Sequence, residues 1–448
     1  MADGTCENGN DKRTHVPQIT DLLPTLALSV SSFILAVLIL VTVHELGHYL
    51  VGRWRGIGAE VFSVGFGPEL FAVTDRRGTR WRLALIPLGG YVKFRGDASV
   101  ASAPSGEGGE GGFEAASLLS RALTVAAGPA VNLLFAVLLI AGAAWWSGVA
   151  EEEPRIGALR PFPAPTGLET GDLVLSVADR GVSGVVDLIE LSESLPPGAP
   201  LPWTVERDGE RLIVPGPRPL PPLIERVNPL SPAARAGLAP GDVILELDGE
   251  PVSDFSELRE AVLGSDGAPV LLRVWRDGDR FEVRITPERT DQPLPGGRFE
   301  TRWVLGVGAG PAFEPALRTP GVLEALTIGA ERTWEVVVLN GSALAHLVTG
   351  AISPCNVRGV ITMGEVSGAS AAQGAGSFVM FLALLSVVIG FMNLLPIPTL
   401  DGGHLALYAW EGVTGRAPSP RVMSAMMTVG MVLLIGFMAL GLLNDLTC

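Results

Sequence analysis

Several apolar segments of this chain are long enough to cross a lipid bilayer. A spanning helix needs about 20 apolar residues, because the hydrocarbon layer is about 30 Å thick and each helical residue advances about 1.5 Å. Four segments reach this length: 22–51, 122–149, 376–396 and 422–443. Hydrophobic residues make up 48% of the 448-residue chain, which agrees with several spans. The sequence therefore predicts a polytopic α-helical membrane protein with four transmembrane helices.

The distribution of charge predicts how the chain is oriented, because cytoplasmic loops are enriched in arginine and lysine. The segment 53–121 holds nine of them, whereas 151–320 has 28 Asp and Glu against 17 Arg. We therefore expect 53–121 in the cytoplasm and 151–320 outside. In a bacterium this means a multi-pass protein of the inner membrane with a periplasmic part. The net charge of −15 argues against nucleic acid as a partner.

The predicted cytoplasmic segment is β-rich. Residues 60–95 have a strand pattern with a hairpin turn at Arg76-Arg77-Gly78, so we expect a hairpin or small sheet there. The stretch "SGEGGEGG" at 105–112 is typical of a flexible linker.

The polar N-terminus lacks the features of a secretory signal, so the first apolar run is expected to remain. Three widely spaced cysteines argue against a disulfide framework and a thiolate zinc site.

An internal repeat occupies the predicted periplasmic part. "GLETGDLVLSVADRGV" (167–182) matches "GLAPGDVILELDGEPV" (237–252), and "VERDGERLIV" (205–214) matches "VWRDGDRFEV" (274–283), at offsets of 70 and 69 residues. Two tandem α+β domains are the simplest explanation. The second copy resembles a PDZ domain of the bacterial protease type, which binds extended peptides at a sheet edge. We expect a peptide or a trimmed substrate C-terminus as the ligand class; the alternative is a spacer that binds nothing.

A polar motif interrupts the first span. "HELGH" places His44 and His48 one helical turn apart on the same face. Polar side chains are costly within the bilayer, so they are rarely without a role. Two neutral imidazoles at this spacing can bind one zinc ion, with Glu45 next to the metal-bound water. The alternative is a structural polar cluster between helices.

A catalytic zinc site needs a third protein ligand and an open position. The stretch "NLLPIPTLDGGHL" (393–405), at the end of the third span, offers Asp401 and His404, and spacing alone does not choose between them. Two prolines prevent a regular helix there, which is tolerated at membrane depth where the backbone lines a buried cavity. The alternative for Asp401 is the N-cap of a helix that follows a plain loop.

These motifs together resemble the site-2 protease family of M50-type intramembrane zinc metalloproteases. The resemblance runs from about residue 22 to 446 and includes "FSVGFG" (62–67), "IPLGGYVKF" (86–94), "GPAVN" (128–132) and "NLLPIPTLDGGHL". It implies Asp401 as third ligand of one zinc ion per chain, with His44 and His48, and Glu45 as general base and acid. Asn393 is implied as a substrate or oxyanion contact. Three further residues of the shared motifs are candidates for substrate binding: Gly89, Gly90 and Asn132.

The resemblance implies a zinc-dependent endopeptidase that cleaves single-span membrane proteins, such as an anti-sigma factor already trimmed by another protease. An edge strand within 60–95 would hold the unwound substrate, since unpaired backbone groups can bind an extended segment. One alternative is a PDZ-bearing membrane scaffold with a structural or absent metal, which would not need Glu45. Another is a metal transporter, which would need more intramembrane acids and histidines than the chain has.

The stretch 322–349 is apolar but carries several charges. Because HELGH and the LDG motif must meet on the cytoplasmic side, it should lie on or dip into the outer surface as an amphipathic helix in contact with lipid, without crossing. The resulting division is a polar extension (1–21), a membrane helix with HELGH (22–52), a cytoplasmic β-rich loop and linker (53–121), a second membrane helix (122–150), two PDZ-like domains (151–220 and 221–290), a periplasmic linker with the surface helix (291–375), a third membrane helix (376–396), the LDG motif with a cytoplasmic loop (397–421) and a fourth membrane helix (422–443).

The two PDZ-like copies differ in how well they keep the peptide-binding pattern. The first has "PFPAPTG" where the second has "PLSPAARAG". We therefore expect the pair to act as a gate more than as a tight binder. Folded domains just outside the site would exclude substrates with a bulky external domain, and removal of 155–288 should admit them.

Overall fold

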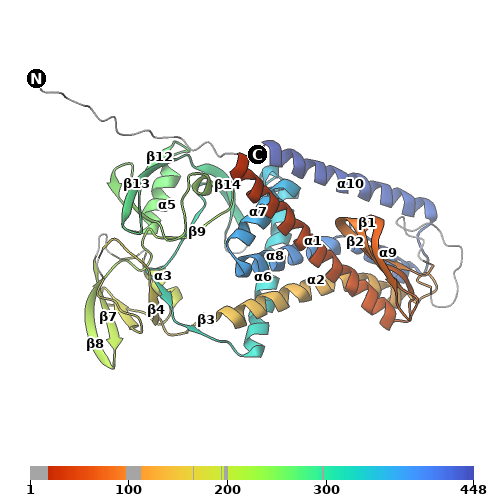
Figure 1. Ribbon diagram of the computed structural model, residues 1–448, viewed down its shortest axis with the longest axis horizontal. Coiled ribbons are helices and arrows are strands. Elements are labelled where there is room, and N and C mark those ends of the chain that lie inside the picture. Colours follow the sequence, from red (N-terminus) through yellow and green to blue (C-terminus); the bar gives the residue numbers. More distant parts are fainter. Residues whose placement is uncertain are drawn as a thin grey trace, which may run out of the picture.

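The helices that could cross a membrane form one group (Figure 1). The computed structural model describes residues 19–96, 112–164, 166–192, 194–195, 200–294 and 297–447, so most of the predicted N-terminal extension and Gly-rich linker lies outside the described residues. Within these ranges four helices are long and apolar enough to span: α1 (Ile19–Trp54), α2 (Leu118–Ser147), α8 (Ala375–Leu394) and α10 (Pro420–Thr447). They coincide with the four predicted spans, so the chain is a multi-pass membrane protein.

Helix α2 packs against both α1 and α8 and so forms the centre of the helical part. Small residues allow α1 and α2 to approach closely where they cross. A Cβ atom added to Gly47 of α1 would lie 2.6 Å from the carbonyl oxygen of Ala127 in α2, which is closer than atoms can pack. Gly47 lies within the HELGH motif, so this crossing brings α2 directly beside the motif histidines.

The strands predicted within 60–95 are present as β1 (Ala59–Thr74) and β2 (Arg80–Phe94). The predicted turn is also present, and Gly78 adopts the positive φ of +83° that favours glycine. Both strands bend, so that 59–64 lies between two parts of β2 and pairs with 80–83 and with 90–94. Apolar side chains are exposed on the outer half of this sheet: Phe66, Leu70, Phe71, Val73, Leu83, Leu85 and Ile86.

The middle of the chain forms two α+β units with the same strand order. The first unit contains β4 (Ile156–Leu159), β5 (Leu173–Val177), β6 (Arg180–Gly181), α3 (Val185–Ser192), β7 (Leu201–Arg207) and β8 (Glu210–Gly216). The second contains β9 (Ile224–Val227), α4 (Pro232–Arg235), β10 (Val243–Leu247), β11 (Glu250–Pro251), α5 (Phe255–Gly264), β12 (Val270–Arg276) and β13 (Asp279–Ile285). The sheets run β6-β5-β7-β8 and β11-β10-β12-β13, as the aligned sequences suggest.

The region predicted as a linker after residue 290 differs from that prediction. It begins with the hairpin of β14 (Glu288–Leu294) and β15 (Arg298–Val304) and continues as β16 (Val307–Ala309), β17 (Phe313–Pro315) and β18 (Leu317–Arg318). These last strands return along the molecule: β16 pairs with β9, β17 with β4, and β18 with β3 (Val149–Ala150). Leu305 joins the core of the second unit and Phe313 that of the first. The two units therefore extend beyond the predicted boundary because both need strands from this segment.

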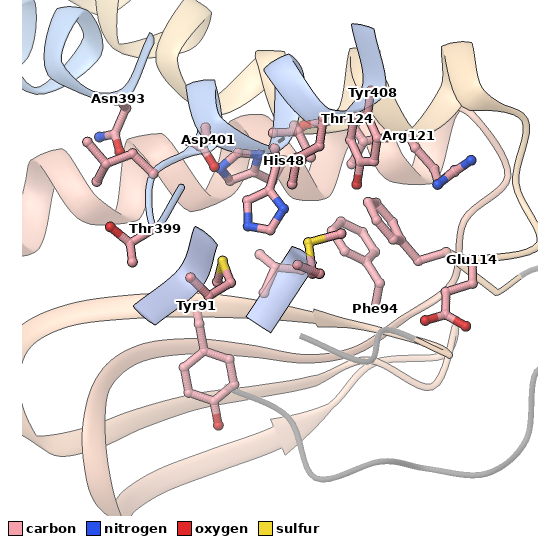
Figure 2. A pocket seen from close by; sticks show the side chains of 18 of the residues that line it. His48, Tyr91, Phe94, Glu114, Arg121, Thr124, Asn393, Thr399, Asp401 and Tyr408 are labelled. Carbon is pink, nitrogen blue, oxygen red and sulfur yellow. Dashed lines mark hydrogen bonds and ion pairs between the residues drawn. The ribbon is translucent and has the colours of Figure 1, made fainter. Parts of the chain in front are cut away.

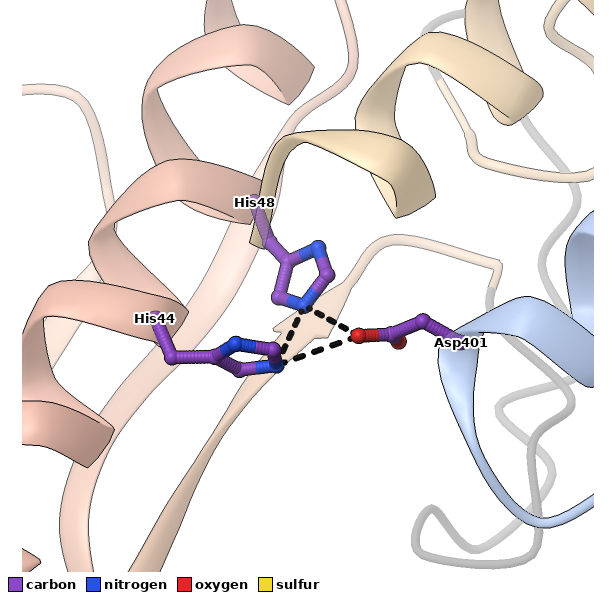
Figure 3. Close-up of side chains that lie close together, drawn as sticks. All are labelled: His44, His48 and Asp401. Atoms are coloured by element: carbon purple, nitrogen blue, oxygen red, sulfur yellow. Dashed lines mark hydrogen bonds and ion pairs between the residues drawn. The ribbon is translucent and has the colours of Figure 1, made fainter. Parts of the chain in front are cut away.

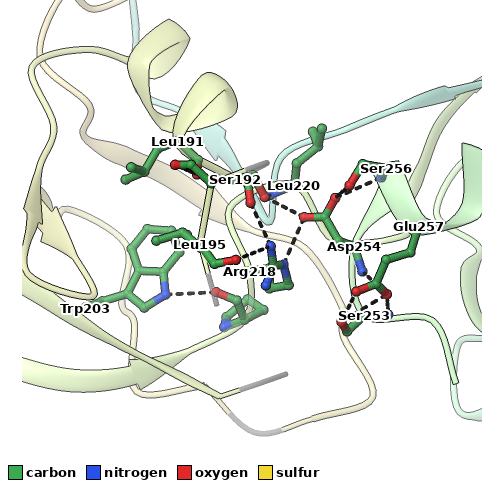
Figure 4. A network of polar contacts seen from close by, with 12 residues as sticks. Leu191, Ser192, Leu195, Trp203, Arg218, Leu220, Ser253, Asp254, Ser256 and Glu257 are labelled. Atoms are coloured by element: carbon green, nitrogen blue, oxygen red, sulfur yellow. Dashed lines mark hydrogen bonds and ion pairs between the residues drawn. The ribbon is translucent and has the colours of Figure 1, made fainter. Parts of the chain in front are cut away.

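A buried polar network joins the two units (Figure 4). Arg218, in the connection between them, donates from Nε to Asp254 Oδ2 at 2.9 Å and from Nη2 to the carbonyl oxygen of Ser192 at 2.6 Å. The Ser192 hydroxyl donates to the same carboxylate oxygen at 2.6 Å. Asp254 also caps α5 by accepting from the backbone N–H of Ser256. One carboxylate thus connects the end of α3, the connection and the start of α5.

Three further helices complete the chain: α6 (Val322–Thr349), α7 (Val360–Ala372) and α9 (Asp401–Thr414). Helix α6 covers the stretch predicted as a surface helix, and it is not one of the four described helices that qualify as spans. It is drawn at a steep angle to α2 in Figure 1. The predicted loop after the LDG motif is instead largely the helix α9.

The C-terminal helix α10 is tied to the start of α7. Asp445 of α10 accepts backbone hydrogen bonds there, and Cys355, in the segment before α7, is disulfide-bonded.

Candidate active site

Two histidines and one aspartate converge between α1 and α9 (Figure 3). The Nε2 atoms of His44 and His48 lie 3.2 Å apart. Asp401 Oδ2 is 3.1 Å from Nε2 of His44 and 3.5 Å from Nε2 of His48. Within the described part of the chain these three residues are the group of potential ligands whose donor atoms all lie within 4.8 Å of one another. His404, which spacing left as an alternative, is not a member.

Local structure explains why Asp401 joins the histidines. The chain leaves α8 at Leu394, turns through a non-helical segment and starts α9 at Asp401. A carboxylate in the first turn of a helix is favoured by the helix dipole. Asp401 therefore points from the start of α9 toward α1, whereas His404 lies one turn further along the helix.

The ring of His48 is held by a second interaction. Its Nδ1 lies 2.9 Å from the carbonyl oxygen of Thr124 in α2. A carbonyl can only accept a hydrogen bond, so Nδ1 carries the proton and donates it. The lone pair of neutral His48 then lies on Nε2, the atom that faces His44 and Asp401. This is the usual arrangement of a histidine that binds a metal ion.

The donor set fits a zinc ion. Two imidazole nitrogens and one carboxylate oxygen are the ligands of many catalytic zinc sites, which keep the fourth position for water or substrate. Asp401 Oδ2 is buried and has no hydrogen-bond partner of good geometry, although it faces both rings. A Cβ added to Gly128 of α2 would collide with both histidine rings, so only glycine leaves them this space. These donor atoms and the space around them are suited to binding a cation.

Electrostatics at the site favour the ionised form of Asp401. Burial alone would raise the pKa of its carboxyl group, but hydrogen bonds and positive charge from the histidine rings in their protonated form outweigh burial and hold the pKa well below its usual range. An ionised carboxylate is the form that binds a metal ion.

Glu45 lies beside this cluster but does not belong to it. The backbone N–H of Val92 in β2 lies close to its carboxylate. The strand can approach α1 this closely because position 90 is glycine: a Cβ there would lie 2.6 Å from the carbonyl oxygen of Ser63 and 3.0 Å from Val41 Cγ1. Glu45 thus provides a carboxylate that lies next to the three potential ligands without being one of them.

These groups open into a cavity of about 740 Å³ (Figure 2). Asn393 and Thr399 lie toward one end of it, and Arg121 and Glu114 toward the other, with His48 between them. The sheet contributes Tyr91, Val92 and Phe94, and α10 contributes Met423 and Met427. The cavity is therefore lined by residues of α1, α2, β2, α9 and α10.

The sequence patterns did not indicate a polar contact between two residues that line this cavity. Arg121 of α2 donates from Nη2 to Glu411 of α9 at 2.7 Å, and its guanidinium lies 5.1 Å from the centre of the Tyr408 ring. The contact ties α9, which carries Asp401, to α2. The partners are 290 positions apart in the sequence, which explains why no local pattern indicated the contact.

The predicted substrate-binding residues occupy different places. Asn393 lines the cavity, and its Nδ2 donates to the carbonyl oxygen of Ile389 at 3.0 Å. Gly89 and Gly90 are not among the described residues that line it; they allow the backbone to turn and pack at the start of the segment 90–94. Asn132 is fully buried, with its Nδ2 3.3 Å from His44 Nδ1, so it contacts a potential ligand.

Comparisons with known proteins agree with this arrangement. Residues 32–437 match the model of peptidase family M50. A protein of Rhizobium meliloti strain 1021, named "putative zinc metalloprotease", is 33% identical over 434 residues, which cover 95% of this chain and 98% of that protein. The regulator of sigma-E protease RseP of Salmonella typhimurium strain 14028s is 33% identical over 454 aligned positions, which cover 93% of this chain and 98% of that protein. The match spans most of the chain and includes the converging residues, so this protease belongs to peptidase family M50, the site-2 protease family.

Proposed function

We propose that the protein is an intramembrane zinc endopeptidase that cleaves the transmembrane segments of single-span membrane proteins. One observation carries the proposal: His44 and His48 of a membrane helix meet Asp401, while Glu45 remains outside the group of potential ligands. A purely structural metal site would not require a second carboxylate outside the ligand group. One zinc ion per chain would be held by the Nε2 atoms of both histidines and the Asp401 carboxylate.

Glu45 would carry the proton transfers of peptide hydrolysis. Bound zinc supplies Lewis acidity, which polarises a carbonyl group and lowers the pKa of water. The Glu45 carboxylate accepts a proton from the attacking water and later gives it to the leaving amine, so water is added across the broken C–N bond. The nearby N–H of Val92 would help to hold the carboxylate between the ligands and the strand. Asn393 could donate to the developing oxyanion after releasing the carbonyl oxygen of Ile389.

The segment 90–94 is the best candidate for holding the substrate. It pairs with 59–64 on one side, and Tyr91, Val92 and Phe94 line the cavity. A peptide bond within a helix is shielded, so the substrate must unwind before attack, and an extended segment could then pair with this strand. The exposed apolar side chains on the outer half of the sheet support contact with lipid beside the site.

The orientation predicted from charge remains part of the proposal. We place the protein in the bacterial inner membrane, with the site near the cytoplasmic face and the two α+β units in the periplasm. There the units would act as PDZ-like domains, with a peptide or the C-terminus of a trimmed substrate as a further ligand class. Among the described helices, α6 does not qualify as a span by length and composition. This supports the orientation, because a fifth span would put the LDG motif on the opposite side from HELGH.

Replacing Asp401 by asparagine should weaken zinc binding strongly and remove proteolysis. The amide keeps the size of the side chain but loses the charge of the oxygen that faces both histidines. His404→Ala is the matched control, because His404 also lines the cavity but lies outside the ligand group. Zinc content of the purified variants is the measurement. Retention of zinc by Asp401→Asn and its loss by His404→Ala would reverse the assignment.

The two α+β units should exclude substrates that keep a bulky external domain. The short pairing of β3 with β18, Ala150 with Leu317, closes the segment that contains them, so residues 152–315 can be replaced by a short linker. The boundaries 155–288 expected from sequence would leave β16 and β17 without their partners. The deletion variant should cut untrimmed substrate that the full chain refuses.

The measurement is co-expression of each enzyme form with an intact and a pre-trimmed single-span substrate. A deletion variant that also carries Glu45→Gln shows whether any cleavage comes from this enzyme. An active deletion variant that still refuses the intact substrate would contradict gating. Strong dependence on the last residues of the trimmed substrate would instead favour recognition in a peptide groove.

A further inference from the structure

The side chain of Asn132 in α2 is completely buried against His44. Its relative exposure is 0%, and its Nδ2 lies 3.3 Å from His44 Nδ1. Its other polar atom, Oδ1, is buried without a hydrogen-bond partner. An unpaired buried amide oxygen is destabilising, so such groups need an explanation. Neither the substrate role implied by family resemblance nor the packing of α2 explains it.

The tautomer of His44 supplies the explanation. To bind zinc through Nε2, neutral His44 must carry its proton on Nδ1. That proton then needs an acceptor. Rotating the Asn132 amide by half a turn places Oδ1 where Nδ2 lies, so that Oδ1 accepts the Nδ1–H of His44. The opposite arrangement, in which Nδ2 donates to Nδ1, would put the proton of His44 on the atom that must bind the metal.

We propose that Asn132 is a positioning residue of the metal site: its Oδ1 accepts the Nδ1–H of His44 and directs the Nε2 lone pair to the ion. This inference rests on the proposed zinc site and gives Asn132 a different role from substrate contact. The two ligand histidines are then held in the same way from one helix. His48 donates to the backbone carbonyl of Thr124, and His44 donates to the side chain of Asn132.

The backbone around Asn132 is itself fixed. Ser386 of α8 is fully buried, and its hydroxyl donates to the Asn132 carbonyl oxygen at 2.8 Å. The contact joins α2 to α8 at the level of the ligand. Asn132 therefore cannot move away from His44 without breaking a second buried hydrogen bond, which suits a residue that must hold a ring in one orientation.

Zinc affinity of two variants tests the proposal. Asn132→Leu keeps a similar volume but removes the acceptor, and Asn132→Asp keeps an acceptor at the same place. Loss of such a partner typically weakens metal binding about 10- to 100-fold. We expect that loss for Asn132→Leu and near wild-type or tighter binding for Asn132→Asp. The measurement is competition for zinc between the full-length protein in detergent and a chelator of known affinity.

Controls separate positioning from general damage. Asn393→Leu removes an amide that lines the cavity and donates to the carbonyl oxygen of Ile389 instead of contacting a ligand histidine. This variant should keep wild-type zinc affinity. The unfolding temperature of the zinc-free protein should stay close to the wild-type value in Asn132→Asp, because this variant keeps an acceptor for His44. If Asn132→Leu does not fold, Asn132→Asp alone tests the proposal. An acceptor role for Asn132 predicts that Asn132→Asp keeps its zinc affinity, whereas a donor role predicts that this variant loses it.

Two outcomes would overturn different statements. A wild-type protein that binds no zinc under these conditions contradicts the proposed function. A wild-type protein that binds one zinc ion, with unchanged affinity in Asn132→Leu or reduced affinity in Asn132→Asp, contradicts only the role of Asn132.

Discussion

Glu45→Gln should abolish peptide cleavage while the protein keeps its zinc. The amide retains the size of the side chain and can still lie near Val92, but it cannot accept a proton from water. A positioned general base typically contributes 10²- to 10⁴-fold to the rate, and we expect a loss of at least about this size. Zinc should remain because Glu45 is not a member of the ligand group of His44, His48 and Asp401.

The measurement combines the cleavage rate of a purified single-span substrate with the zinc content of the same sample. Glu331→Gln, an equivalent change on the exposed face of α6, is the matched control and should cleave like wild type. Near wild-type cleavage by Glu45→Gln would show that another group is the base. Loss of zinc together with activity would mean that Glu45 is a ligand instead.

Asp254→Ala should destabilise the two α+β units by about 3–5 kcal/mol, because removal of one partner leaves the other charge buried and unpaired. The side chains of Arg218 and Asp254 are only 4% and 1% exposed. An exposed pair provides the matched control: Glu288→Ala, which removes the partner of Arg235, should change stability by less than about 1 kcal/mol. Urea unfolding of the full-length protein in detergent, followed through the buried Trp203, measures both.

The effect of Asp254→Ala should depend on pH. Burial alone would raise the pKa of Asp254, but hydrogen bonds from Ser192, Ser256 and Arg218 outweigh it and lower the pKa. A group whose folded pKa lies below its unfolded value of about 3.9 contributes stability above that pH, and the contribution is lost as the pH falls through the folded pKa. The difference between wild type and variant should therefore be full near pH 7 and shrink in acid. A difference that stays constant down to pH 3 would contradict this assignment.

Local sequence patterns were sufficient for much of this protein. The apolar lengths predicted the four spanning helices, since the bilayer sets the number of residues that a helix needs. The strands around Gly78 followed from a turn signal, and the spacing of His44 and His48 placed both on one helical face. The sequence match between 167–182 and 237–252 indicated two units of one topology. Each of these features depends on residues close together in the chain.

Only the tertiary structure decided how distant segments combine. The choice of Asp401 over His404 depends on where α9 starts relative to α1, because both residues fit the spacing and only one reaches the histidines. The return of β16 and β17 to strands far earlier in the chain extended both units past residue 290, since short strands carry little local signal about their partners. The burial of Asn132 against His44 likewise arises from the crossing of α1 and α2. Periodicity predicts which face of an element is buried, but the partner that covers it is decided by packing in three dimensions.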